Sequence, residues 1–324
     1  MQVLQRKHIL QADARSQWYR FKLTFGLGVK TEKNFLVSEA ALRFIRGILP
    51  QGAKITTFGR RDGIGMQALS RMSAIAFARA FGAEYIHTPF ESIDHTPANQ
   101  ISWAQKWEDF FGFSKHYKVI DETYEIIDYQ DYMQRPKQLA SNSVLFFQQC
   151  WWFTRRYPDF YLNIAPELRA GMNLSTERGE RLRAAIHVRR GDVSASANKM
   201  RYTDDASILR SIDSLQRMAR EAGRDLAISV YSQGSPEEFA AFKARGCELH
   251  LDTDAIETMK AMIESDILVM SKSSFSYVAA LLNTGVIVYE PTFNPPLSSW
   301  IRKRDDGSVD VKRLVAALDK ARPA

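Results

Sequence analysis

The sequence has few cysteines and no long hydrophobic run. Its two cysteines, Cys150 and Cys247, lack metal-ligand spacing, so we expect ordinary buried or half-buried thiols. The longest apolar runs, such as Ile267 to Met270 and Tyr277 to Leu282, are far shorter than the roughly 20 residues of a membrane-spanning helix. Residues 1–17 carry charges where a signal peptide needs an apolar centre, which predicts a cytoplasmic protein.

Low-complexity tracts, internal repeats and long Lys/Arg blocks are also missing. Because acidic residues are interleaved almost everywhere, the sequence argues against a dedicated nucleic-acid binder. A net charge of +7 still permits an anionic partner (a nucleotide, a nucleic acid or a phospholipid surface), the alternative being a solvated basic surface. With 324 residues, of which 45% are hydrophobic and 25% charged, the chain is predicted to be globular and to form two domains.

The first half of the chain predicts a parallel α/β unit. Lys54 to Phe58 has the pattern of a strand, Gly59 to Gly65 that of a turn, Met66 to Phe81 that of a helix, and Glu84 to His87 that of the next strand. A strand, a glycine-containing turn, a helix and a second strand in this order are typical of a doubly wound sheet.

Aromatic residues are concentrated in the middle of the chain. Their spacings of three and four positions predict helices with a wide apolar face. Core packing is the main interpretation, and a sugar-stacking platform is the alternative. The residues concerned are Trp103, Trp107, Phe110, Phe111, Phe113, Phe146, Phe147, Trp151, Trp152 and Phe153.

The second half repeats the alternation of strands and helices. Strands are predicted at residues 184–188, 226–231, 248–251, 267–270 and 286–289, and helices at 204–222, from 236, at 255–264 and at 276–283. We therefore expect an N-terminal α/β domain over residues 1–175, carrying an aromatic-rich helical insertion, and a C-terminal α/β domain over 176–324. Ligands of such sheets bind beyond the carboxyl ends of the strands, in a cleft.

The segment HVRRGD, His187 to Asp192, follows the first predicted strand of the second half. An arginine at this position suits a diphosphate, because its planar fork donates paired hydrogen bonds to phosphate oxygens. Gly191 lets the backbone turn. The alternatives are a surface Arg-Asp pair and, far less in keeping with a strand end, an RGD adhesion motif.

A serine-rich turn precedes another predicted helix in the segment 264–285. Ser271, Ser273, Ser274 and Ser276 lie where free backbone N–H groups and the helix dipole attract an anion. The hydroxyls could equally do no more than cap the helix. Taken with Arg189, the turn favours a diphosphate pocket.

Together, HVRRGD and the later SDILVMSKSSFSYVAALLN resemble the fucosyltransferase superfamily, which includes the α1,2- and α1,6-fucosyltransferases and the bacterial nodulation fucosyltransferases. The segment RRDGIGMQALSRMSAIAFARAFGAEYI, Arg60 to Ile86, is similar to the Gly-Asn-Gln turn and helix of the α1,2 members, with Met66 in place of the asparagine before Gln67. The resemblance spans roughly Lys54 to Tyr289 and implies a GT-B-like fold, with two Rossmann-like domains facing each other across a cleft and a GDP-sugar held mainly by the C-terminal one.

The resemblance also implies roles for individual residues. Arg189 matches the arginine that pairs with the donor β-phosphate, which leaves Arg190 to brace the loop through Asp192. Further donor-binding residues are expected at His187 beside the nucleoside, at Gly63 and Gly65 in the N-terminal turn, and at Ser273, Ser274 and Phe275, with Arg190 counted on the donor side as well. Thr258, with Glu257 beside it, stands where the family often has an aspartate for guanine, which leaves the nucleotide base open.

The implied reaction is an inverting, metal-independent glycosyl transfer, most simply of fucose from GDP-fucose. No metal is expected, because an arginine and a helix N-terminus can stabilise the leaving diphosphate; Asp252 and Asp254 resemble a metal-binding Asp-x-Asp but suit helix capping better. A carboxylate or histidine should deprotonate the acceptor hydroxyl. The candidates are Asp192, His95, His87, Glu91 and Asp94, and we expect Arg189, Asp192 and His95 to form the catalytic set.

The expected partners are a nucleotide-sugar donor and a glycan or lipid-linked oligosaccharide acceptor, with no nucleic acid. Synthesis of a bacterial surface or exported polysaccharide would place the protein in the cytoplasm, in peripheral contact with the anionic inner membrane. The main alternative is a non-catalytic nucleotide- or glycan-binding protein that keeps the fold, and a weaker one is a nucleic-acid binder that uses the positive charge.

Overall fold

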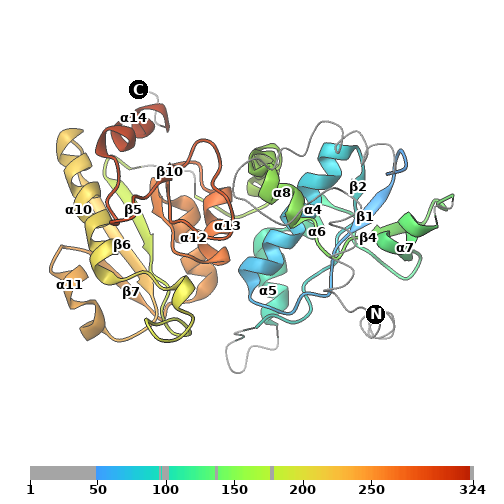
Figure 1. The fold of residues 1–324 in the computed structure, drawn as a ribbon, viewed down its shortest axis with the longest axis horizontal. Coiled ribbons are helices and arrows are strands. Elements are labelled where there is room, and N and C mark those ends of the chain that lie inside the picture. Colours follow the sequence, from blue (N-terminus) through green and yellow to red (C-terminus); the bar gives the residue numbers. More distant parts are fainter. Residues whose placement is uncertain (1–48, 95, 97–101, 136–137, 176–178, 322–324) are drawn as a thin grey trace.

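The structure is a computed structural model that describes residues 49–94, 96, 102–135, 138–175 and 179–321. Two α/β units follow each other along the chain and lie side by side along the long axis of the molecule (Figure 1). Within the described residues, no helix is both long enough and apolar enough to cross a bilayer.

The first unit is built on a sheet of four parallel strands in the order β2-β1-β4-β3. The sheet holds together because its central strands are apolar: Ile55, Val144 and Leu145 are fully buried. Its strands are β1 (Lys54–Thr56), β2 (Glu84–Tyr85), β3 (Glu125–Asp128) and β4 (Ser143–Phe146), and its helices are α4 (Ile64–Phe81), α5 (Trp103–Phe111), α6 (Phe113–His116), α7 (Tyr129–Gln134), α8 (Trp151–Arg156), η1 (Pro158–Asn163) and α9 (Ala165–Ala170).

The second unit is a sheet of six parallel strands in the order β10-β9-β8-β5-β6-β7. Helices cover it because nearly every crossover between parallel strands contains one. The strands are β5 (Leu182–His187), β6 (Leu226–Ser232), β7 (Glu248–Leu251), β8 (Ile267–Val269), β9 (Val286–Tyr289) and β10 (Ile301–Arg302), and the helices are η2 (Lys199–Arg201), α10 (Asp205–Glu221), η3 (Pro236–Phe239), α11 (Ala240–Lys243), α12 (Ala255–Glu264), α13 (Ser274–Leu282) and α14 (Val311–Ala321).

The predicted fold class is confirmed: the chain forms two doubly wound parallel units that face each other across a cleft. The aromatic-rich middle differs from the expectation of helices alone, because β3 and β4 lie inside it. Both strands are four residues long, too short for a period to distinguish from a loop, and pairing decides their conformation: β4 pairs with β1, and β3 pairs with β4. Core packing accounts for most of the aromatic side chains there, since Trp107, Phe113 and Phe153 are fully buried.

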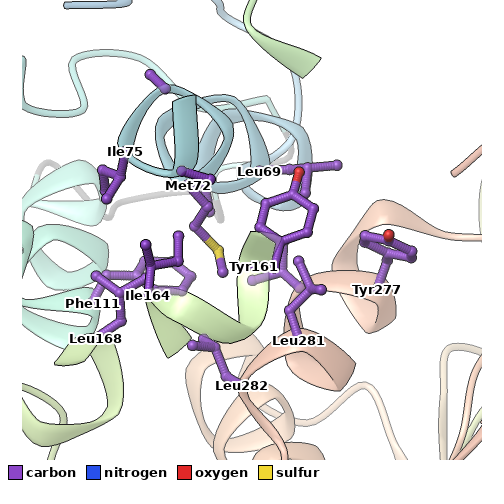
Figure 2. Packing of buried hydrophobic residues seen from close by; sticks show 14 of the residues in the cluster. Leu69, Met72, Ile75, Phe111, Tyr161, Ile164, Leu168, Tyr277, Leu281 and Leu282 are labelled. Atoms are coloured by element: carbon purple, nitrogen blue, oxygen red, sulfur yellow. The ribbon is translucent and has the colours of Figure 1, made fainter. Parts of the chain in front are cut away.

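A single apolar cluster joins the two units. Helix α4 of the first unit packs against α13 of the second, and Figure 2 shows Leu69 and Met72 of α4 near Leu281 and Leu282 of α13, with Tyr161 between them. A separate cluster fills the far side of the second sheet, under α10 and α14. The two units therefore share part of their hydrophobic core.

The strand order of the second sheet reverses between β5 and β8. From β5 the chain proceeds outward to β6 and β7, then returns to β8 and proceeds the other way to β9 and β10. The carboxyl ends at such a reversal diverge and leave a crevice, which is where doubly wound folds bind ligands.

Candidate functional site

A cavity of about 830 Å³ lies between the two units at that crevice. Its walls come from the segments that follow β5, β6, β7 and β8, from the first turns of α4 and α13, and from α5. Its charged lining residues are Arg189, Arg190, Arg201, Asp62, Asp94, Asp192, Asp252 and Asp254. HVRRGD and the serine turn, which are far apart in the sequence, are thus brought to the same cavity.

Arg189 stands at the carboxyl end of β5, with its side chain largely covered. Its Nε and Nη2 donate to the two carboxylate oxygens of Asp192, at 3.1 and 2.6 Å, and its Nη1 donates to Ser273 Oγ at 3.2 Å. The guanidinium therefore links HVRRGD to the serine turn and remains at the cavity wall.

Arg190 is anchored in a different direction. Its Nη2 donates to the carbonyl oxygen of Thr203 at 3.1 Å and pairs with Asp205 at the start of α10, while its guanidinium lies 4.6 Å above the ring of Tyr202. The expectation that Arg190 braces the loop through Asp192 is wrong, because Asp192 pairs with Arg189. Arg190 holds the loop by the segment that leads into α10.

His187 ends β5 and lines the cavity. Its Nδ1 is 2.8 Å from Ser271 Oγ, and its ring centroid is 5.7 Å from that of Phe275. Burial, and to a lesser extent the positive charge of Arg189, lower the pKa of His187 to about 3. The imidazole is therefore neutral near pH 7 and offers a hydrogen-bonding group, not a positive charge.

The serine turn opens α13 toward the cavity. Ser273 is the N-cap residue and its Oγ accepts from Phe275 N at 3.2 Å, so this hydroxyl caps the helix and also accepts from Arg189. Ser274 and Phe275 line the cavity beside it. Ser273 therefore does cap the helix, as the alternative interpretation expected, and the capped end of α13 lines the cavity.

Helix α4 also begins at the cavity. Its N-cap residue is Gly63, which has no side chain to cover the first backbone N–H groups of the helix. A Cβ atom built on Gly65 would lie 2.5 Å from Phe275 N and 2.7 Å from Ser274 C. The sequence predicted that a side chain here would block a ligand or strain the backbone. The structure gives another reason, because the missing side chain lets the first turns of α4 and α13 touch.

Two carboxylates of the cavity lining come from the first unit. Asp62, which pairs with Arg60, lies just before α4, and its carbonyl oxygen accepts from Gln67 Nε2 at 2.7 Å. Gln67 also donates to the carbonyl oxygen of Ser92 at 2.7 Å, which fixes the segment that carries Asp94. Asp62 was missed in the sequence, although its place before the glycine turn is a usable signal.

The other proposed proton acceptors lie elsewhere. His95 is outside the described residues. His87 is fully buried with its Nε2 2.6 Å from Glu108 Oε1, and burial lowers its pKa despite that partner. Glu91 is exposed and is not part of the described lining of the cavity. Asp94 and Asp192 do line it.

The far end of the cavity is formed by the segment between β7 and α12. Thr258 lines it, with its Oγ1 2.9 Å from that of Thr253, whereas Glu257 is exposed in the first turn of α12. Asp254 caps α12 by accepting from the backbone N–H groups of residues 256 and 257 at 2.8 and 3.2 Å. Asp252 takes a left-handed φ of 51° and also lines the cavity. Over the described residues, no three His, Cys, Asp or Glu side chains gather as a metal ion would require.

The sequence matches no protein-family model and no curated protein. Solved structures that resemble the chain include POFUT1 in complex with GDP (12% identity, 73% of this chain and 96% of that one, TM-score 0.39). Others are the Escherichia coli heptosyltransferase WaaC with ADP-2-deoxy-2-fluoro heptose (14%, 83% and 98%, TM-score 0.39), and a glycosyl transferase of family 9 from Veillonella parvula (9%, 84% and 98%, TM-score 0.40).

Proposed function

We propose that the protein is a nucleotide-sugar-dependent glycosyltransferase. The observation that carries the proposal is Arg189, whose guanidinium lies at the crevice between β5 and β8, next to the N-terminus of α13, which in turn touches the first turn of α4. An arginine fork and two helix N-termini are donors that suit a diphosphate. The cavity extends from them along the ends of β6 and β7, which leaves space for a nucleoside.

The proposed reaction is an inverting displacement. The acceptor hydroxyl oxygen forms a bond to the anomeric carbon, the bond from that carbon to the diphosphate oxygen breaks, and its electron pair leaves with the diphosphate. Arg189 and the N–H groups of α13 stabilise that growing charge. The hydroxyl proton passes to a carboxylate of the same cavity, with Asp62, Asp94 and Asp192 as the groups in place and His95 as the residue next to Asp94 in the sequence.

For the substrates, we propose GDP-fucose as the first donor to test and a glycan or lipid-linked oligosaccharide as acceptor, in the synthesis of a bacterial surface or exported polysaccharide. We propose that the enzyme needs no metal, because Arg189 and the N-terminus of α13 could stabilise the leaving diphosphate in its place. His187, Thr258 and Glu257 would lie on the nucleoside side of the donor. Because Thr258 stands where the family often has an aspartate for guanine, the nucleotide panel below includes bases other than guanine.

A panel of GDP-, ADP-, UDP- and CMP-sugars tests the proposal. One nucleotide class should raise the melting temperature, since a ligand at 100 times its Kd adds about 2.7 kcal/mol of stability. Turnover with that donor should survive EDTA. A loss restored by Mg²⁺ or Mn²⁺ would assign a metal to Asp252 or Asp254, and stabilisation without turnover would favour the non-catalytic alternative.

The matched pair Arg189→Lys and Arg190→Lys locates the diphosphate. Lysine keeps the charge but loses the fork, so Arg189→Lys should lower turnover about a hundredfold, the loss of roughly 3 kcal/mol of transition-state stabilisation. Arg190→Lys should act mainly on the melting temperature, because Arg190 bonds to Thr203 and Asp205. The reverse result would exchange the two assignments.

A further inference from the structure

The fork of Arg189 already holds an anion, the carboxylate of Asp192. Two parallel hydrogen bonds, Nε to Oδ1 at 3.1 Å and Nη2 to Oδ2 at 2.6 Å, form the same bidentate arrangement that a phosphate group uses on an arginine. The diphosphate of a donor cannot use this edge of the guanidinium while Asp192 occupies it.

The turn that carries Asp192 is built to keep the carboxylate there. Gly191 has a left-handed φ of 79°, and a Cβ atom on it would lie 2.5 Å from Gln233 Oε1. The carbonyl oxygen of Asp192 accepts from Asn198 Nδ2 at 2.8 Å, and Arg190 anchors the same segment to Thr203. The pair is therefore a feature of the folded turn.

We propose that Asp192 is an internal competitor for Arg189. In the empty protein it occupies the guanidinium; the donor diphosphate displaces it; and after sugar transfer it takes Arg189 back as the nucleoside diphosphate leaves. Asp192 is thus a positioning residue that sets donor affinity and product release, and this role rests on the proposed function. While the diphosphate is bound, the Asp192 carboxylate would no longer be paired with Arg189 and could accept a hydrogen bond or the proton of the acceptor hydroxyl.

The ion pair between Arg189 and Asp192 is weak enough for a diphosphate to displace it. Side-chain exposure is 18% for Arg189 and 36% for Asp192, and a partly exposed ion pair of this kind contributes on the order of 1 kcal/mol or less. A diphosphate carries more negative charge than one carboxylate and can also reach the N-terminus of α13, so it displaces Asp192. The competition nevertheless lowers its apparent affinity, as for any ligand whose binding-competent state is only partly populated.

Isothermal titration of inorganic pyrophosphate and of GDP into the wild type and Asp192→Asn tests the proposal. Asparagine keeps the size of the side chain and removes its charge. We expect Asp192→Asn to bind pyrophosphate three to ten times more tightly than the wild type, and the dissociation constant of GDP to fall by a similar factor. A structural defect would weaken binding, so a gain in affinity distinguishes the two.

Asp252→Asn is the matched control, because it removes the same charge from the same cavity at a residue that tolerates a left-handed φ as asparagine. It should change pyrophosphate affinity by less than twofold. Asp192→Ser provides a second variant without the carboxylate, should the asparagine variant fold poorly. Equal tightening by Asp252→Asn, or unchanged or weaker binding by both folded Asp192 variants, would overturn the proposal.

Pyrophosphate has no base and no sugar, so its result is separate from the proposed function. If GDP, ADP and UDP all fail to bind while Asp192→Asn still gains affinity for pyrophosphate, the competition at Arg189 is upheld and the nucleotide-sugar function is overturned. If a nucleotide binds and the Asp192 variants show no gain, the function is upheld and the competition is overturned.

Discussion

At the scale of single residues, the surroundings of His187 determine what this side chain can contribute to the site. The sequence places His187 two residues before Arg189, and the resemblance assigns it to the nucleoside. In the structure its Nδ1 meets Ser271 Oγ and burial holds its pKa near 3, so it cannot exchange a proton with a substrate near pH 7. Its contribution to the site is a neutral, oriented ring.

This half-buried, neutral histidine should make the protein sensitive to acid. The unfolded chain protonates His187 near its ordinary pKa of about 6.5, whereas the folded protein does not until about pH 3, so stability is present above 6.5 and falls as the pH drops below it. Between pH 6.5 and 5, above the titration of most carboxylates, one such group costs about 1.5 to 2 kcal/mol.

The substitution His187→Asn keeps a polar group near the Nδ1 position and should flatten this slope. Urea unfolding of both proteins at pH 8, 6.5 and 5 measures it, and the difference at pH 8 gives the cost of the substitution itself. Identical slopes for the two proteins would show that His187 is not the titrating group.

The candidate site could be predicted in part from single residues. Arg189, His187 and Ser273 were expected in one pocket because they follow strands whose carboxyl ends share an edge, and the structure brings them to one cavity. The partners of the two arginines could not be predicted. Asp205 pairs with Arg190 from the start of another helix, and no local pattern selects it over Asp192.

At the scale of elements, α4 and α13 determine the site. Both helices were predicted from their apolar patterns, and each begins two residues earlier than expected, at Ile64 and Ser274. The strands β3 and β4 were missed. The contact between the two helix N-termini could not be predicted either, because it depends on which helix of one unit faces which helix of the other.

Gly65→Ala should therefore disturb both stability and donor binding. The added Cβ would meet backbone atoms of Ser274 and Phe275, which cannot rotate away, so α13 must shift with Ser273 on it. We expect a loss of 1–3 kcal/mol in the free energy of unfolding, as overpacking generally costs, and a weaker thermal shift with the donor nucleotide.

Gly179→Ala is the control for this change, since a Cβ atom there meets nothing within 4 Å. It should leave stability nearly unchanged. If Gly65→Ala is as stable as the control and binds the nucleotide normally, the two helix ends are not in the contact described.

At the scale of the whole molecule, the fold class was predictable because strand and helix periods alternate over most of the chain, while the relative placement of the units was not. One exposed surface combines basic and apolar side chains. Met200, 92% exposed, lies between the basic side chains of Lys199 and Arg201, and the Arg201 guanidinium is 5.9 Å from the ring of Phe293, which is 41% exposed. Arg201 also lines the cavity.

The peripheral contact with an anionic membrane expected from the sequence would involve these side chains. Basic residues near such a surface contribute about 1 kcal/mol each, and exposed apolar side chains add to that. The protein should sediment with phosphatidylglycerol vesicles more than with phosphatidylcholine vesicles, and less as salt is raised. Met200→Glu should reduce the binding severalfold.

Leu162→Glu makes the same charge change at another exposed apolar residue, 48% exposed, in the first unit. It should bind nearly as the wild type does. Equal binding to the two kinds of vesicle, or an equal loss of binding in both variants, would contradict the expected contact with an anionic membrane.

The shared core between α4 and α13 restricts which substitutions the two units can accept. Phe77 and Met72 on one side and Leu281 and Leu282 on the other belong to one buried cluster, and Gly65 lies against the backbone of α13. A bulkier residue on either side is acceptable only with a smaller one opposite. Exchanging one half for the corresponding half of another protein of this fold should therefore lower stability unless the residues that face each other across α4 and α13 are exchanged together.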